Sequence, residues 1–210
     1  MGNLWKGFKE HRTFRFTSLL VILLIALVVL APVIAPYNPL EAVMKDANQA
    51  PSMAHLFGTD KLGRDVLSRI LYGGAYSLSS VLALVAIIFC VGTFLGLVAG
   101  YFGGLIDTVI MRIADMMISF PGVILAIAIA GIMGGSLVNA MIALTAVTWT
   151  KYARLSRSMV LKIRKRDFVD AAIVSGGTDA HILWQHIMPN VVPILVITAV
   201  SDIGLSLIHI

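Results

Sequence analysis

Two long stretches without a charged side chain constrain this chain more than any other feature of its sequence. No Lys, Arg, Asp or Glu occurs between Arg69 and Asp107, or between Asp115 and Lys151. A helix needs about 20 apolar residues to cross a bilayer, so each stretch can hold at least one crossing. The chain is 59% hydrophobic and 13% charged, whereas a soluble domain is about 25% charged. The sequence therefore predicts an all-α, polytopic membrane protein.

The basic residues predict the orientation of the chain. They concentrate before the first apolar stretch and in one later segment, and Lys and Arg are enriched on the cytoplasmic side of membrane proteins. We therefore expect both segments, and the amino end, in the cytoplasm. This distribution accounts for the net charge of +5 without nucleic-acid binding. The residues are Lys6, Lys9, Arg12 and Arg15, and then Lys151, Arg154, Arg157, Lys162, Arg164, Lys165 and Arg166.

Five membrane spans are expected. The first, residues 17–35, is longer than the apolar core of about 7–15 residues in a signal peptide, so we interpret it as an uncleaved span. Residues 77–101 form the second. Residues 116–150 would reach about 50 Å as one helix and are therefore divided at a turn. The fifth covers residues 191–204. Three prolines, Pro32, Pro36 and Pro39, end the first span; Pro121-Gly122 kinks the third, and Gly134-Gly135-Ser136 separates the third from the fourth.

Two sequence patterns predict local packing around the second span. Residues 37–76 carry balanced charges and are expected outside the membrane, where a turn precedes an amphipathic helix. Asp65 and Arg69 are spaced i,i+4 and are expected to pair on that helix. Within the span, Gly92, Gly96 and Gly100 lie four apart on one face, a spacing that lets helices approach closely.

Residues 151–187 are expected to form a large basic inner loop, followed by the fifth span. Within it the stretch from Phe168 predicts a short helix that ends at Gly176, where glycine permits a left-handed conformation. Thr178 or Asp179 can cap the next helix, and Pro189 marks where that helix meets the span. The alternative is an ordinary amphipathic loop.

Three segments together resemble one known family. The first is Asp170-Ala171-Ala172, then Gly176, then Pro189 thirteen residues later. The second is HLFGTDKLGRDVLSRILYG, residues 55–73, and the third is MRIADMMISFPG, residues 111–122. Residues 13–204 are similar to the inner-membrane permease subunits of binding-protein-dependent ABC importers, in the "C"-type subunit of the dipeptide/oligopeptide/nickel branch. Three positions depart from the family pattern: Asp170 replaces the usual Glu, and His186 and Met188 stand where Ile and Leu are commoner.

The resemblance implies a role for each motif. The cytoplasmic helix is expected to be a coupling helix, between the fourth and fifth spans, that docks on a separate ATPase. Its coupling residues are Phe168, Asp170, Ala171, Ala172, Gly176, Gly177 and Pro189. The extracytoplasmic motif comprises Gly58, Thr59, Asp60, Gly63, Arg64, Asp65 and Arg69. The domains are expected at residues 1–36 (amino tail and first span), 37–76 (extracytoplasmic segment) and 77–210 (permease domain).

The resemblance also implies partners and a location. The expected partners are a homologous second permease, two ATP-binding cassette ATPases and an external solute-binding protein. The expected location is the plasma membrane of a bacterium or archaeon. Peptides are the expected cargo, with nickel or another small solute as the alternative. Family members have six spans, so this chain is expected to be truncated. Its last residues, Leu205 to Ile210, look like a translated sequencing adapter and are expected to be foreign.

No catalytic motif is present, and no cofactor is expected. Without a G-x-x-x-x-G-K-[ST] sequence the chain has no P-loop for ATP. Among the five histidines only His181 and His186, which are spaced i,i+5, approach metal-ligand spacing. Because they lie in the expected docking loop, we interpret them as surface residues and not as ligands. An intramembrane enzyme or a passive channel remains an alternative, but Asp202 is the only acid within the predicted spans. Because an intramembrane acid is costly, Asp202 either faces a translocation path and attracts a cationic group, or lies at a helix end near the outer surface.

Overall fold

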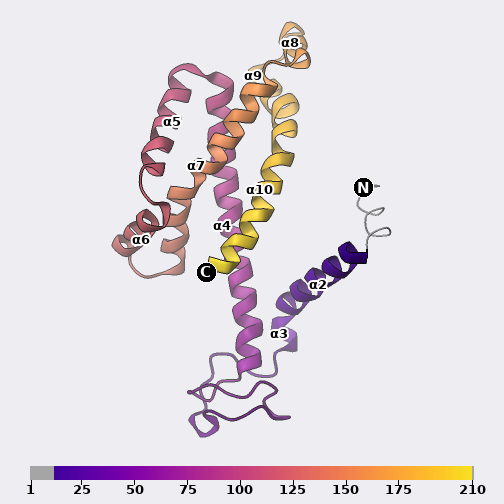
Figure 1. Ribbon diagram of the computed structural model, residues 1–210, viewed down its shortest axis with the longest axis vertical. Coiled ribbons are helices and arrows are strands. Elements are labelled where there is room, and N and C mark those ends of the chain that lie inside the picture. The colour runs from indigo at the N-terminus through magenta and orange to yellow at the C-terminus, as the bar shows by residue number, and fades with distance from the viewer. Residues whose placement is uncertain (1–11, 210) are drawn as a thin grey trace. The chain divides into compact units, whose positions relative to one another are not determined.

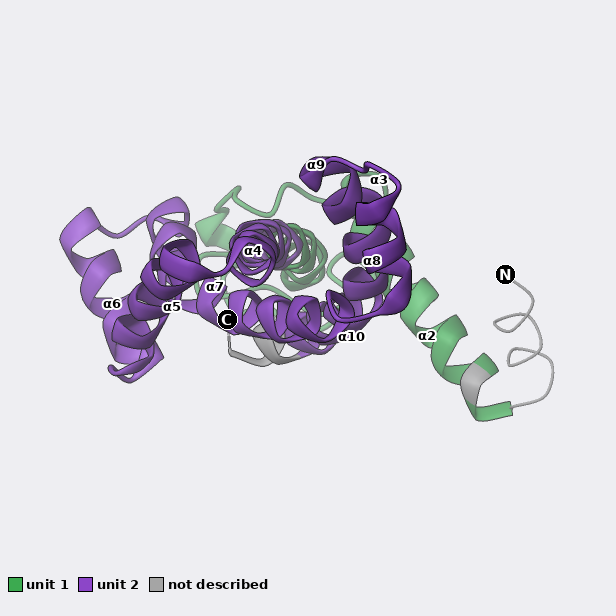
Figure 2. Ribbon diagram, turned by 90° about the horizontal axis from the view of Figure 1, so that it is seen from above, with its two compact units in different colours: residues 1–79 green, residues 80–210 purple. Residues whose placement is uncertain are grey.

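The computed structural model describes residues 12–209, without the side chains of Phe14 and of residues from 205 onward. The predictions for Lys6, Lys9 and the side chains of residues 205–210 fall outside this part. Every regular element within residues 12–209 is a helix, which confirms the all-α prediction. The chain divides into two compact units, residues 1–79 and 80–210, whose boundary falls inside helix α4 (Figure 2).

Among the described residues, two helices are long and apolar enough to cross a membrane. They are α4 (Val66–Phe102) and the continuous helical run Asp179–Gly204. A third crossing results if α5 (Gly104–Ile118) and α6 (Gly122–Met133), which meet at 91°, count as one broken span. The polytopic architecture is therefore confirmed, while the number of five spans stays a prediction.

The first predicted span, residues 17–35, is interrupted by its first proline. Helix α2 covers Arg12–Val29, and a single turn, α3, covers Ala31–Ile34. Pro32 has no N–H group, and its ring clashes with the carbonyl four residues earlier, so the helical ladder breaks near Leu30. The helix thus begins earlier and ends earlier than predicted, and its apolar part is shorter, Arg15–Val29.

Helix α4 replaces two predicted elements. The amphipathic helix expected after Asp65 and the second span are one helix of 37 residues, Val66–Phe102. Its length is about 55 Å at 1.5 Å per residue, well beyond the hydrocarbon core of ~30 Å. No proline lies within it, and Gly73-Gly74 lowers helix propensity without removing a hydrogen bond.

The segments on either side of the third and fourth spans are more helical than predicted. Residues 102–115, expected as a connection, lie mostly in α5, which starts after Gly103 at φ 66°. The predicted kink at Pro121 is a complete break. The turn at residues 134–136 is confirmed, because α7 (Leu137–Ile163) begins there and Ser136 accepts the N–H of Asn139. Residues 151–163, predicted as loop, continue α7.

Close contact between α4 and α7 forms the core of the second unit (Figure 1). A Cβ atom at Gly96 would lie 2.3 Å from the carbonyl oxygen of Ala153, and one at Gly92 would lie 2.5 Å from that of Trp149. A Cβ at Gly100 would meet Val160 at 2.8 Å. The predicted role of this glycine face is therefore confirmed: only hydrogen at these positions leaves room for α7.

The last part of the chain packs on this pair of helices. It comprises α8 (Asp167–Val174), α9 (Asp179–His181), the π-helix η2 (Ile182–Ile187) and α10 (Met188–His209). One apolar cluster joins them to α4 and α7. Its fully buried members include Tyr152, Val160, Val169, Ile182, Ile187, Val191 and Leu195.

The first prediction tests the glycine contact. Gly96→Ala should lower the thermal stability of the detergent-solubilised protein, because the added methyl group overlaps a backbone carbonyl and such overpacking costs about 1–3 kcal/mol. Gly73→Ala in the same helix is the control, since nothing lies within 4 Å of its Cβ position; it should stabilise by about 0.5–1 kcal/mol. Equal effects of the two substitutions would contradict the packing argument.

Candidate functional site

Helix α8 ends in a Schellman motif. The N–H of Gly177 donates to the carbonyl of Ala172 at 3.0 Å, and the N–H of Gly176 donates to that of Ile173 at 3.0 Å. Gly176 has φ 81°, a left-handed conformation that favours glycine. Gly177 is also constrained, because a Cβ there would lie 2.9 Å from the oxygen of Ala172. Both glycines therefore determine where the short helix stops.

The two faces of α8 have different environments. Val169 is fully buried and Ala172 packs against the apolar cluster. On the opposite face Asp170, Ala171 and Val174 are exposed, Val174 to 87%. The two adjacent alanines of the motif thus have different environments: Ala172 packs inside the protein, and Ala171 lies on an outward face.

Two hydrogen bonds at Tyr101 connect this region to α4. The hydroxyl of Tyr101, in the last turn of α4, donates to Asp179 at 2.7 Å. Arg164 donates to the carbonyl of Tyr101 at 2.7 Å, and its guanidinium lies 5.7 Å from the ring centroid. Thr178, rather than Asp179, caps α9 by accepting the N–H of His181. The segment after α8 is therefore tied to a membrane-crossing helix.

The predicted junction at Pro189 lies at the start of α10. Pro189 lies in the first turn of α10, where a missing N–H costs little, and the helix runs on without interruption from α9 through η2. A π-helix often marks a functional site. Here η2 buries Ile182, Leu183 and Ile187 while leaving Trp184 52% exposed.

Three basic residues of α7, predicted in an open loop, pair with acidic residues of neighbouring helices. Arg157 donates to both carboxylate oxygens of Asp107 at 2.5 Å. The three pairs are spaced at every third residue of α7 and connect it to α5 and α10. They are Lys151–Asp202, Arg154–Asp115 and Arg157–Asp107.

Asp202 is held by α7. The Lys151 ammonium group lies 2.6 Å from one carboxylate oxygen, and the Tyr152 hydroxyl donates to the other at 2.8 Å. The carboxylate side chain is 19% exposed, and α10 continues beyond it to His209. Asp202 is therefore not at a helix end, and its cationic partner comes from the protein itself. Sequence reasoning missed Lys151 because the residue was assigned to a loop.

The motif predicted to be extracytoplasmic forms an ordered polar turn around Asp60. Its carboxylate accepts the backbone N–H groups of Leu62 and Arg64, at 2.9 and 3.0 Å, and the guanidinium groups of Arg64 and Arg69. Partial desolvation raises the pKa of Asp60, but the hydrogen bonds from Arg64 and Leu62 outweigh it and hold the pKa well below its usual range. The ionised form therefore stabilises the turn, and this stabilisation is lost as the pH falls below about 4.

The predicted pair between Asp65 and Arg69 is wrong. Arg69 binds Asp60 instead. Asp65 accepts the backbone N–H of Ser68 at 2.8 Å, as the cap of α4, and lies 3.0 Å from Nδ1 of His55. At the start of a helix, an Asp side chain that accepts a backbone N–H as a cap stabilises the helix more than one that pairs with the residue at i+4.

The remaining motif residues close the turn. Gly58 and Gly63 have φ 72° and 73°, and their Cβ positions would overlap the carbonyl oxygens of Gln49 and Val43. The Thr59 hydroxyl accepts the N–H of Gln49 at 2.8 Å. The structure brings the seven predicted residues together in this turn and the first turn of α4, where Arg69 reaches back to Asp60. Within the described residues no three His, Cys, Asp or Glu side chains are grouped to hold a metal ion.

The second prediction concerns this turn. Asp60→Asn should speed tryptic cleavage after Lys61 and Arg64 by about tenfold, because it removes the charge-assisted hydrogen bonds that hold the turn closed. Cleavage is followed by mass spectrometry of reconstituted protein. Glu41→Gln removes the same charge from the same segment, where the Glu41 side chain forms no hydrogen bond with the described residues; it should leave the rate unchanged. A similar rate for wild type and Asp60→Asn would refute the role of Asp60.

The third prediction concerns the pair between α7 and α10. Lys151→Asp and Asp202→Lys should each reduce the amount of folded protein in the membrane, because each leaves like charges facing one another in a poorly hydrated region. The double exchange should restore part of the loss, with a coupling energy of about 0.5–3 kcal/mol. Purely additive losses would show that the two side chains do not interact.

Comparison with known proteins agrees with the geometry. Residues 92–210 match the family described as binding-protein-dependent transport system inner membrane component. Residues 1–51 match the N-terminal TM domain of oligopeptide transport permease C.

Individual relatives are similar over nearly the whole chain. The glutathione transport system permease protein GsiD of Pectobacterium atrosepticum is 38% identical over 97% of this chain and 68% of its own length. The probable D,D-dipeptide transport system permease protein DdpC of Escherichia coli is 36% identical over 91% of this chain and 64% of its own length. The dipeptide transport system permease protein DppC of Alkalihalophilus pseudofirmus is 36% identical over 98% of this chain and 67% of its own length. The chain thus spans about two thirds of the length of these relatives, and it belongs to the family of inner-membrane permease subunits of binding-protein-dependent ABC importers.

Proposed function

We propose that this chain is a permease subunit for di- or oligopeptides that couples to a separate ATPase through α8. The observation that carries the proposal is the outward face of α8, where Ala171 and Val174 are exposed while Val169 and Ala172 anchor the helix from behind. A short apolar face on a rigidly supported helix suits docking into a partner's groove. The coupling role of Phe168, Asp170, Gly176 and Pro189 follows from the family resemblance.

The proposed orientation has α8 and the amino end in the cytoplasm. Lys162, Arg164, Lys165 and Arg166 lie at the end of α7, directly before α8, which agrees with the cytoplasmic enrichment of basic residues. Residues 37–65 are then extracytoplasmic. We also propose the domain division at residues 36 and 76.

The cargo is proposed from the relatives. The three named above transport glutathione, D,D-dipeptides or dipeptides according to their names, and all of these are peptides. Nickel or another small solute would give the same architecture with a different cargo.

The proposed complex contains a homologous second permease, two ATP-binding cassette ATPases and an external binding protein. Closure of the ATPases would move α8. Because Tyr101 and Val169 tie this region to α4 and α7, the movement would pass to the membrane helices as a rigid-body rearrangement. Asp202 could then line the path only in a state that releases it from Lys151.

The fourth prediction separates docking from folding. In cells that carry the complete importer, Ala171→Trp should abolish uptake of labelled dipeptide without changing the amount of protein in the membrane, since the outward face has room for the ring. Ala172→Trp should instead lower the amount of protein, because Ala172 packs against the buried cluster. Gly176→Asp should also abolish uptake. Nickel is tested as a competing cargo in the same cells.

Full uptake by the Ala171→Trp variant would overturn the docking role. Uptake of nickel without uptake of any peptide would overturn the proposed cargo and leave the docking role intact.

A further inference from the structure

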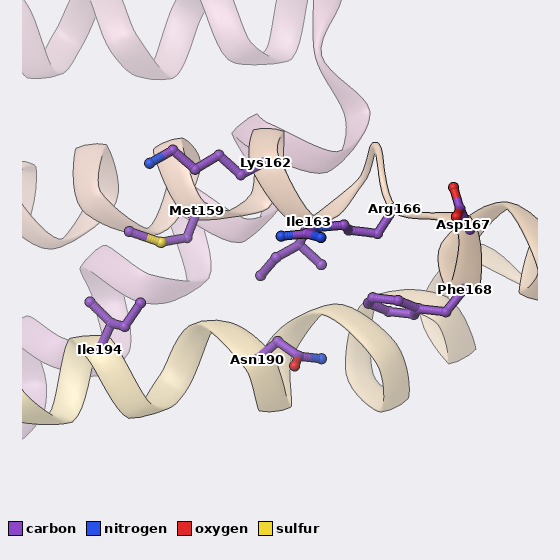
Figure 3. A pocket seen from close by; sticks show the side chains of 8 residues that line it. All are labelled: Met159, Lys162, Ile163, Arg166, Asp167, Phe168, Asn190 and Ile194. Carbon is purple, nitrogen blue, oxygen red and sulfur yellow. The ribbon is translucent and has the colours of Figure 1, made fainter.

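A groove beside α8 combines positive charge with an apolar floor. It lies between the last turns of α7 and the first turns of α10 and has a volume of about 600 Å³ (Figure 3). Its lining residues are Met159, Lys162, Ile163, Arg166, Asp167, Phe168, Asn190 and Ile194.

The charge in this groove is not neutralised within the described residues. Within the described residues the side chains of Lys162 and Arg166 form no hydrogen bond or ion pair, in contrast to those of Lys151, Arg154 and Arg157 in α7. Asp167 is the one acid in the lining, and Figure 3 shows its carboxylate pointing away from the space that Arg166 and Phe168 face.

The apolar floor runs from the charged end toward the membrane-spanning part of α10. Met159 and Ile163 contribute from α7, and Ile194 contributes from α10, where it is 40% exposed. Ile197 continues the same helix and is 69% exposed. Figure 3 shows the Lys162 side chain extending above Met159 and the Arg166 side chain beside Ile163, so both cations border the apolar floor. Cations beside an uncharged, apolar track suit a molecule with an anionic head and a long apolar tail.

We propose that this groove binds an anionic phospholipid of the cytoplasmic leaflet. Lys162 and Arg166 bind the phosphate, Arg166 through its planar pair of donors, and one acyl chain lies against Met159, Ile163 and Ile194. Asn190 supplies an amide to the glycerol region. Basic pockets between membrane helices on the cytoplasmic side are suited to anionic lipid head groups.

An acidic segment of a partner protein could also neutralise the two cations. It would not use the apolar track along α10, which lies at membrane depth if Asp179–Gly204 crosses the bilayer. The lipid uses both features, and its head group lies beside Phe168 of α8. The proposal rests on the cytoplasmic position of α8 given above.

The test measures lipid binding by the purified full chain, without ATPase or transport. The protein is taken from nanodiscs that hold equal amounts of phosphatidylglycerol and phosphatidylcholine, and the lipids that stay bound are counted by native mass spectrometry. Wild type should retain phosphatidylglycerol preferentially. Lys162→Gln and Arg166→Gln should each lower that preference about fivefold, the effect of one basic residue near an anionic surface.

Lys165→Gln is the matched control. It removes one positive charge from a residue that lies between Lys162 and Arg166 in sequence but does not line the groove. It should keep the preference, as should Lys162→Arg. Equal retention of both lipids by wild type, or an equal loss in Lys165→Gln, would overturn the proposal. Displacement of the lipid by millimolar inorganic phosphate would also overturn it, since a simple anion site needs no acyl chain. Failure of peptide uptake or of ATPase docking would leave these lipid counts unchanged.

Discussion

The close approach of α4 to α7 at Gly92, Gly96 and Gly100 is the contact on which the rest of the second unit depends. It brings backbone against backbone, and in lipid such contact replaces the hydrophobic effect as the source of helix association. Once α7 is fixed there, its other faces are available to α5, α6 and α10. The apolar cluster that anchors α8 is built on the same pair of helices.

Charge organises the outer faces of α7. Each acid of α5 and α10 that would be costly in the membrane meets a basic residue of α7, so these helices carry little net charge where they meet. Beyond Arg157 this pairing stops, and the side chains of Lys162 and Arg166 have no acidic partner among the described residues. The change from paired to unpaired cations lies between α7 and the start of α8, where the proposed lipid groove is located.

Much of this could be predicted from the sequence, and the errors share a physical cause. The glycine face, the turn at residues 134–136 and the left-handed Gly176 depend on local residue chemistry and were predicted correctly. Wrong predictions arose where the structure of a segment depends on residues distant in sequence. The charged residues of 151–157 suggested a loop, because their acidic partners Asp107, Asp115 and Asp202 could not be identified from the sequence. The cap role of Asp65 was missed for a similar reason, since Asp60 attracts Arg69 more effectively from outside the helix. The different environments of Ala171 and Ala172 could not be predicted, because they depend on how α8 packs against the apolar cluster.

The proposed coupling role requires α8 to be the contact with an ATPase. The direct measurement is cysteine cross-linking in membranes that contain the whole importer, with the exposed Cys90 replaced by serine. A cysteine at Ala171 should cross-link to the ATPase subunit and respond to ATP, whereas one at Ser136, at the other end of α7, should not. No cross-link from position 171, or equal cross-linking from position 136, would contradict the account.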